Sequence, residues 1–147
     1  MATAQKTSLA CAVLALFAGL AGPLVAQETD QGAYVAIELN AVEPVEGACR
    51  VSFLVQNGHG FDIDQAVYEA VLFDTEGGVE RLTLFDFADL PAARPRVRQF
   101  VIPELACDGL GRILINGAET CAGAGVASDA CIKDIDLTSR IDVEMMG

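Results

Sequence analysis

From position 34 onward the chain alternates short apolar segments with turn residues, the pattern of a β-rich domain. The apolar segments are about six to ten residues long, are rich in Val, Ile, Leu and Phe, and are separated by Gly, Pro and Asp. No sustained helical period interrupts them. Seven strands are predicted, at residues 34–40, 48–57, 66–74, 79–87, 96–102, 112–116 and 135–144. We therefore expect an all-β fold: an immunoglobulin-like β-sandwich of about seven strands, with a small open β-barrel as the alternative.

Two segments show the alternation most clearly. In residues 48–57, Cys49, Val51 and Phe53 share one face, which predicts that Cys49 lies on the buried side. Residues 135–144 alternate over their whole length and are predicted to form a single strand. Its expected inward side chains are Ile135, Leu137, Ile141 and Val143, and its expected outward side chains are Asp136, Thr138, Arg140, Asp142 and Glu144.

The segment 66–74 departs from this alternation, because it is apolar on both faces except at Glu69. Such a strand is expected at the centre of a sheet with both of its faces covered. In the next segment, 79–87, the side chains of Leu82 and Leu84 face away from those of the two phenylalanines.

The N-terminus carries the three parts of a secretory signal. Lys6 provides a basic start, residues 9–20 an apolar core, and Ala26 the end of a small-residue cleavage site. An uncleaved membrane anchor is disfavoured, because the apolar run is short and interrupted by Gly and Pro. The predicted organisation is a signal peptide at 1–26, a disordered arm at 27–33 and a single disulfide-stapled β domain at 34–147. The mature chain is expected to be periplasmic or secreted, without a membrane span.

The charge is strongly acidic. The chain holds 21 acidic and nine basic residues, a formal net charge of −12. Because every acidic residue follows Ala26 and Lys6 precedes it, the mature chain would carry a charge of −13. Such a chain repels nucleic acid and anionic lipid surfaces, so no nucleic-acid partner is expected. Solubility in an exposed compartment explains the charge more simply than an acidic docking face does.

Four of the five cysteines lie beyond the predicted signal, which removes Cys11. An even number in a small exported domain predicts disulfides. Three pairings are possible, and we favour Cys49–Cys107 and Cys121–Cys131, since the last two cysteines bracket a Gly- and Ala-rich segment that cannot pack by itself. A four-cysteine metal site is disfavoured, because no C-x-x-C pair is present.

A short row of arginines is the most informative polar feature. Arg94, Arg96 and Arg98 would project on the same side of an extended chain. Guanidinium groups suit bidentate contact with carboxylate or phosphate, so the row is a candidate site for an acidic partner or an anionic envelope component. In the alternative interpretation the arginines pair with the chain's own acids on the preceding segment, Glu80, Asp86 and Asp89.

No motif for catalysis or for a cofactor is found. His59, the only histidine, lies between two glycines and is predicted to be an exposed turn residue with no nucleophile near it. Asp62 and Asp64 are weak candidates for calcium binding, because no acidic segment matches an EF-hand loop. Met145 and Met146 are weak candidates for copper, and are more simply interpreted as the end of a strand. We expect no enzyme activity, no cofactor and no metal.

Five stretches, 38–44, 47–50, 81–87, 96–100 and 107–117, together resemble a family of small exported bacterial proteins of unknown function. Members of this family are often labelled as carrying a Tat-pathway signal, although here no arginine pair precedes the apolar core. The resemblance covers most of the mature chain. It implies a periplasmic address and no assigned activity.

These observations favour an uncharacterised exported protein that acts as a non-enzymatic binding or structural module for an envelope protein or component. Its candidate surfaces are the arginine row and an exposed edge strand that a partner strand could extend. The alternative is a β-sandwich that binds a small ligand or a metal, and a small hydrolase ranks last.

Overall fold

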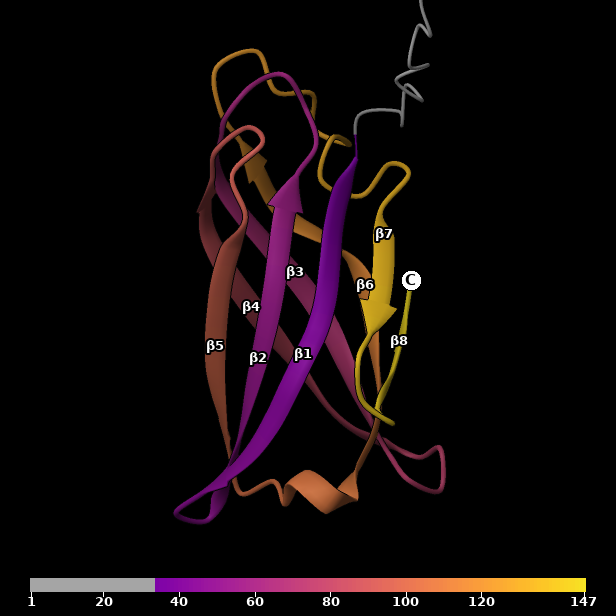
Figure 1. Ribbon diagram of the computed structural model, residues 1–147. Helices are drawn as coiled ribbons and strands as arrows, with labels where there is room; N and C mark the ends of the chain where they lie inside the picture. The colour runs from indigo at the N-terminus through magenta and orange to yellow at the C-terminus, as the bar shows by residue number, and fades with distance from the viewer. Residues whose placement is uncertain (1–33) are drawn as a thin grey trace, which may run out of the picture.

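Eight strands and one short 3-10 turn make up the part of the chain that the computed structural model describes, residues 34–147 (Figure 1). The predicted signal peptide and N-terminal arm lie outside the described residues. The strands are β1 (Val35–Val45), β2 (Ala48–Asn57), β3 (Ile63–Asp74), β4 (Val79–Leu90), β5 (Arg96–Pro103), β6 (Leu110–Ala122), β7 (Asp136–Ser139) and β8 (Glu144–Met146), and the turn is η1 (Cys107–Gly109). No helix among these residues is long and apolar enough to cross a membrane.

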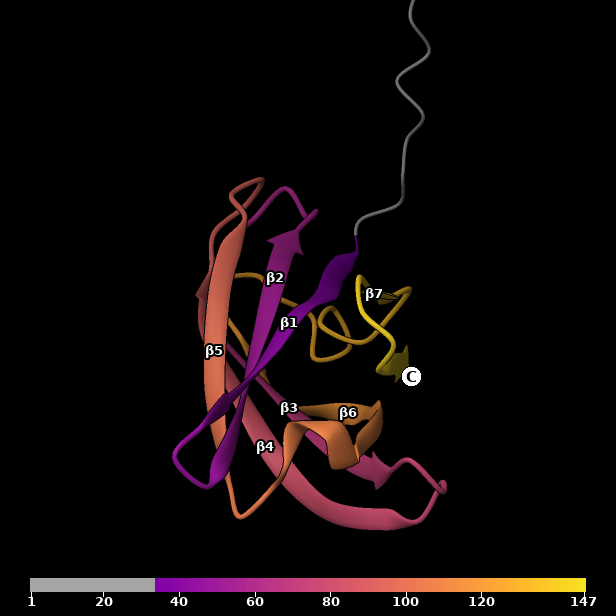
Figure 2. The ribbon, with the colours of Figure 1, turned by 60° about the horizontal axis from the view of Figure 1, so that its bottom comes forward.

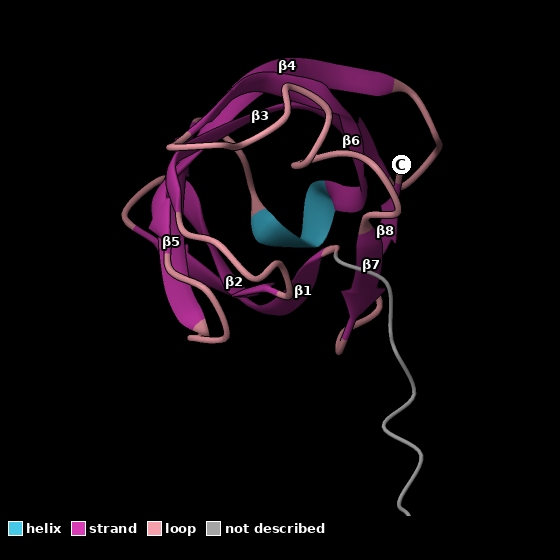
Figure 3. Ribbon diagram, turned by 90° about the horizontal axis from the view of Figure 1, so that it is seen from above, coloured by secondary structure: helices cyan, strands magenta, loops and turns pink. Residues whose placement is uncertain are grey.

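The strands form two four-stranded sheets that pack face to face. We call the sheet with the order β5-β2-β1-β7 sheet A, and the sheet with the order β4-β3-β6-β8 sheet B. Neighbours in each sheet are antiparallel, except that β7 pairs with β1 and β8 pairs with β6 in parallel. Seen from above, the two sheets face each other across the core (Figure 3). The predicted β-sandwich is confirmed, and the sheets do not close into a barrel.

The inner faces of the two sheets form one hydrophobic core. Val35, Ile37 and Leu39 of β1 alternate inward, as do the odd-numbered residues of β2 from Cys49 to Val55. An aromatic cluster joins the two sheets. The ring of Phe53 on sheet A lies 5.2 Å from that of Phe85 and 5.5 Å from that of Phe87 on sheet B, between centroids, in the tilted and edge-on arrangements that aromatic pairs prefer. The alternation predicted along the strands therefore decides which side chains fill the core.

The two disulfides fasten irregular segments to this core. Cys49, fully buried on β2, is bonded to Cys107 in η1, and η1 crosses from sheet A to sheet B at one end of the sandwich (Figure 2). Cys121, near the end of β6, is bonded to Cys131, ten residues later. This is the pairing that the spacing favoured.

The prediction of one continuous C-terminal strand is wrong. The segment divides into β7, which joins sheet A beside β1, and β8, which joins sheet B beside β6 (Figure 1). Between them the chain bends, with the hydroxyl of Ser139 bonded to the backbone of Ile141 and the N–H of Arg140 donating to the carbonyl of Leu39. Inward and outward side chains still alternate across the bend. A period of two residues sets the direction of each side chain, but it does not specify which strand lies beside it.

The central position predicted for the third strand is confirmed, because β3 lies between β4 and β6. The prediction that both its faces are covered holds for one face only. Tyr68 and Leu72 of β3 point into the core, whereas no other described element covers the outer face. Outward-facing apolar side chains of β3 therefore lie on a sheet surface rather than between two layers.

Candidate functional site

Two of the three arginines in the predicted row are engaged with the chain's own β4. Arg96 and Arg98 lie on the face of β5 that turns toward the core, and both approach the carboxylate of Asp89, at 3.6 and 3.2 Å. Arg98 also donates to the backbone carbonyl of Phe87 at 2.6 Å and to that of Asp89 at 2.9 Å. Arg94 precedes β5, is exposed, and its side chain has no partner among the described residues.

These contacts match the alternative interpretation of the row, in which the arginines pair with the chain's own acids. Asp89 is the acid that they share. The carboxylate of Asp86 accepts instead from Gln65 and from the backbone of Ala88, and Glu80 pairs with Arg81 at 3.6 Å. The row is thus a structural bridge between β5 and β4, with Arg94 as its one side chain exposed without a partner in the described region.

β4 and β5 are the edge strands of their sheets and do not pair with each other. The Arg98 contacts join them near one end, and Arg81 donates to the carbonyl of Pro103 at 2.9 Å near the other. Between these bridges lies a narrow groove of about 280 Å³, where Phe85 and Phe100 meet with their ring centroids 4.7 Å apart. This groove is the place where an additional strand would meet unpaired sheet edges.

The outer face of sheet B carries an apolar row that crosses all four strands. Leu82 of β4 is opposite Val71 of β3, Val71 is opposite Leu114 of β6, and Leu114 is opposite Met146 of β8. The two ends of the row are open to solvent, with Leu82 61% and Met146 39% exposed. Leu84, two residues along β4 on the same face, is 55% exposed. We call these five residues the sheet B apolar row.

At the β4 end of this row lies a shallow hollow of about 470 Å³, lined by Leu82, Thr83, Leu84, Glu69 and Glu119. Glu69 is opposite Leu84 in the sheet, and its carboxylate accepts from the side-chain amide of Asn116. The carboxylate of Glu119 has no partner among the described residues. The hollow therefore combines exposed leucines with two carboxylates, and no basic residue lines it.

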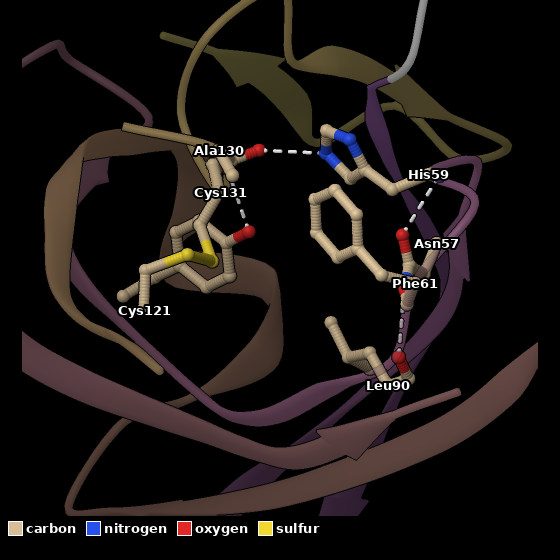
Figure 4. Close-up of a disulfide and its surroundings, with 8 residues drawn as sticks. Asn57, His59, Phe61, Leu90, Cys121, Ala130 and Cys131 are labelled. Carbon is tan, nitrogen blue, oxygen red and sulfur yellow. Dashed lines mark hydrogen bonds between the residues drawn. A yellow bond between two sulfur atoms is a disulfide. The ribbon is translucent and has the colours of Figure 1, made fainter. Parts of the chain in front are cut away.

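The prediction that His59 is an exposed turn residue is wrong. The residue is only 7% exposed, and its ring stacks on that of Phe61 with the centroids 4.8 Å apart (Figure 4). Nε2 lies 2.9 Å from the carbonyl oxygen of Ala130, so this nitrogen carries the proton and donates. The partner comes from 71 residues later in the chain, which is why local sequence around the glycines does not reveal it.

His59 belongs to a cluster that holds loops at one end of the sandwich (Figure 4). Asn57, fully buried, donates from Nδ2 to the carbonyls of Phe61 and Leu90 and accepts from the backbone N–H of His59. Nearby, the hydroxyl of Tyr68 donates to the carbonyl of Cys131 at 2.8 Å, and burial raises the pKa of this phenol far above its ordinary value. No buried side-chain nitrogen or oxygen here lacks a hydrogen-bond partner, which indicates that the cluster anchors loops.

The weak calcium candidates, Asp62 and Asp64, do not belong to a larger group of potential metal ligands in the described region. The carboxylate of Asp62 accepts from the backbone N–H of Ala92 at 2.8 Å, and Asp64 is exposed on β3. Met145 is buried and Met146 is exposed, so the two thioethers lie on opposite faces of β8. Within residues 34–147 no group of three or more His, Cys, Asp or Glu side chains is arranged to hold a metal ion.

Sequence reasoning missed the sheet B apolar row, although its signals are local. The segment that became β3 is apolar on both faces, and Leu82 and Leu84 of β4 alternate with the buried Phe85 and Phe87. These patterns point to two apolar faces on adjacent strands. They do not show that one of the faces is left without a covering layer.

No protein-family model matches the chain, and no curated protein matches its sequence. Among solved structures, the chain is similar to IrmA from Escherichia coli, with a TM-score of 0.59 and 14% sequence identity. The similarity covers 72% of this chain and 92% of that chain. At this identity the likeness concerns the fold alone: the two proteins share the arrangement of the β-sandwich.

Proposed function

We propose that this chain is a non-enzymatic binding module of the cell envelope that docks a partner polypeptide on the sheet B apolar row. The observation that carries the proposal is the row itself: four apolar positions lie in register across four strands, Leu84 adjoins them on β4, and Leu82 and Leu84 are more than half exposed. Isolated exposed apolar residues are ordinary on protein surfaces, whereas a contiguous patch marks a place where another molecule binds.

Sheet A also exposes apolar side chains, but they do not form a continuous row. Leu54 and Val97 are opposite each other on β2 and β5, and the next position in register is Glu38. Val101 is opposite Arg50, which is paired with Glu43. Charged side chains therefore interrupt this face, whereas the row on sheet B continues to its far edge.

Three features support a location in the periplasm or outside the cell: the predicted export signal, the two disulfides and the acidic charge. Disulfides persist in such oxidising compartments and are rare in the cytosol. An envelope partner would meet the module there. The arginine row is a less suitable docking surface, because Arg96 and Arg98 are already engaged by β4.

The test is affinity capture from solubilised cell envelope with three tagged versions of the chain from residue 27 on. These are the wild type, Leu82→Ser/Leu84→Ser, and the matched control Val97→Ser/Val101→Ser, whose side chains are 63% and 56% exposed on the other sheet. We expect the wild type and the control to hold the same partner and the leucine variant to lose it. All three should keep the same melting temperature, because the changed side chains contribute little to the core.

Equal capture by all three versions would overturn the proposed surface. Loss in the valine variant alone would move the docking site to sheet A. An empty capture by the wild type would favour the small-ligand alternative, for which the groove between β4 and β5 is the natural location.

A further inference from the structure

We propose that the partner segment bound at the hollow on sheet B is a cationic, amphipathic polypeptide, with apolar side chains set between Lys or Arg. The inference rests on the proposed function and specifies the chemistry of what docks there. It combines the exposed leucines of β4 with the two carboxylates that border them.

The apolar half of the site is formed by Leu82 and Leu84. They are 61% and 55% exposed and stand two residues apart on one face of β4, which places them about 6.8 Å from each other along the strand. Val71, opposite Leu82 on β3, is only 8% exposed. A partner with apolar side chains at a similar spacing would pack them against the two leucines and so remove both from water.

The charged half of the site is formed by Glu69 and Glu119. Glu69 accepts from the neutral amide of Asn116, so its negative charge is not compensated. The basic residues nearest on sheet B are already paired, Arg112 with Glu144 at 2.8 Å and Arg81 with Glu80 at 3.6 Å. Two carboxylates beside a hollow without basic residues attract a cationic ligand, since close opposite charges favour binding and like charges oppose it.

Lysine and arginine suit both halves of the site. Their aliphatic stems lie along apolar surface while the charged group stays in a polar environment. Stems over Leu82 and Leu84 would bring ammonium or guanidinium groups to Glu69 and Glu119, where charge-assisted hydrogen bonds can form. A segment of this composition thus contacts both the leucines and the carboxylates that line the hollow.

Other occupants fit less well. A second copy of this chain would bring the same acidic surface to the hollow, and an anionic lipid surface would bring negative charge as well. A purely apolar ligand would leave both carboxylates near an apolar surface without a counter-charge. The observations therefore favour a cationic polypeptide segment.

The test uses a fluorescein-labelled hexapeptide of alternating lysine and leucine, with an alternating lysine and serine peptide and an alternating glutamate and leucine peptide as controls. Binding to the disulfide-bonded chain from residue 27 on is measured by fluorescence anisotropy. We expect two double variants, Glu69→Gln/Glu119→Gln and Leu82→Ser/Leu84→Ser, each to raise the Kd for the lysine and leucine peptide about tenfold. A matched variant, Glu46→Gln/Glu104→Gln, removes two charges from another hollow, at the turn between β1 and β2, and should change the Kd by less than about twofold.

If Glu69→Gln/Glu119→Gln and Glu46→Gln/Glu104→Gln weakened binding of the lysine and leucine peptide equally, the peptide would be attracted by the acidic protein in general, and the inference would be overturned. Absence of binding at low salt, or equal binding of the lysine and serine peptide, would also overturn it. If the leucine variant loses its envelope partner while Glu69→Gln/Glu119→Gln keeps it, the proposed function stands and the cationic partner is rejected. If the leucine variant keeps its envelope partner, the proposed function fails whatever the peptide does.

Discussion

At the scale of single residues, side-chain direction follows the position in the alternation. Phe85 and Phe87 of β4 are buried while Leu82 and Leu84, one position out of phase, are exposed. His59 departs from the local expectation because its ring is buried by contacts made far away in the sequence. A pattern within one strand specifies which way a side chain points, and the folded molecule determines what it meets.

Tyr68 offers a test of the loop-anchoring cluster. Replacing it by Phe removes the hydrogen bond to the carbonyl of Cys131 and leaves that buried oxygen without its partner. We expect the free energy of unfolding to fall by about 2 kcal/mol near neutral pH. The wild-type phenol also adds a pH dependence, because burial raises its pKa in the folded state. Its stabilising contribution is complete below pH about 10, the ordinary pKa of tyrosine, and is lost as the pH rises above it, since only the unfolded state then releases the proton.

The difference in the free energy of unfolding between the wild type and Tyr68→Phe should therefore narrow by about 1.4 kcal/mol for each pH unit above 10. Urea unfolding followed by circular dichroism at pH 8 and at pH 11 measures it. Tyr34 is present in both versions and does not affect the comparison. A difference that stays constant or widens between these two pH values would contradict the assignment of the buried phenol.

At the scale of elements, the edges of the two sheets are joined by side chains rather than by strand pairing. Arg98 reaches from β5 to two backbone carbonyls of β4, and Arg81 reaches back from β4 to the carbonyl of Pro103. The same sequence feature that suggested a docking site thus holds the sandwich together. Arginine suits this role because its guanidinium group offers several donors in a fixed geometry.

Arg98→Ala should lower the free energy of unfolding by about 2 kcal/mol, because it removes hydrogen bonds from a charged donor to the carbonyls of Phe87 and Asp89. Arg94→Ala is the matched control and should change the free energy of unfolding by less than about 0.5 kcal/mol, since Arg94 is exposed and its side chain makes no hydrogen bond or ion pair in the described region. Urea denaturation of both variants gives the comparison. Similar losses for both would mean that the bridge between β5 and β4 contributes no specific stability.

At the scale of the whole molecule, two disulfides of very different span stabilise one sandwich. Cys49–Cys107 closes 58 residues and Cys121–Cys131 closes ten. In the chain-entropy model these closures contribute about 4 and about 3 kcal/mol by restricting the unfolded chain. Each bond includes one fully buried cysteine, Cys49 or Cys131, so the two removals leave comparable changes in packing.

Cys49→Ala/Cys107→Ala should therefore lower the melting temperature more than Cys121→Ala/Cys131→Ala does. Calorimetry of the two double variants tests the order. The intact mass of the oxidised wild type should be lower than that of the reduced chain by the mass of four hydrogen atoms. The reverse order of melting temperatures would show that the loop at one end of the sandwich matters more than the long closure, and four free thiols would refute both bonds.

The sequence alone specified what depends on neighbouring positions: an all-β fold, the inward and outward faces of its strands, and a cysteine spacing that favoured the pairing found. Only the tertiary structure decided what depends on distant segments. It divided the C-terminal strand between β7 and β8, buried His59 against Ala130, turned Arg96 and Arg98 toward Asp89, and left one face of β3 without a covering layer. The physical reason is that a period of two residues sets the direction of each side chain, whereas strand partners and covering layers are chosen by long-range packing.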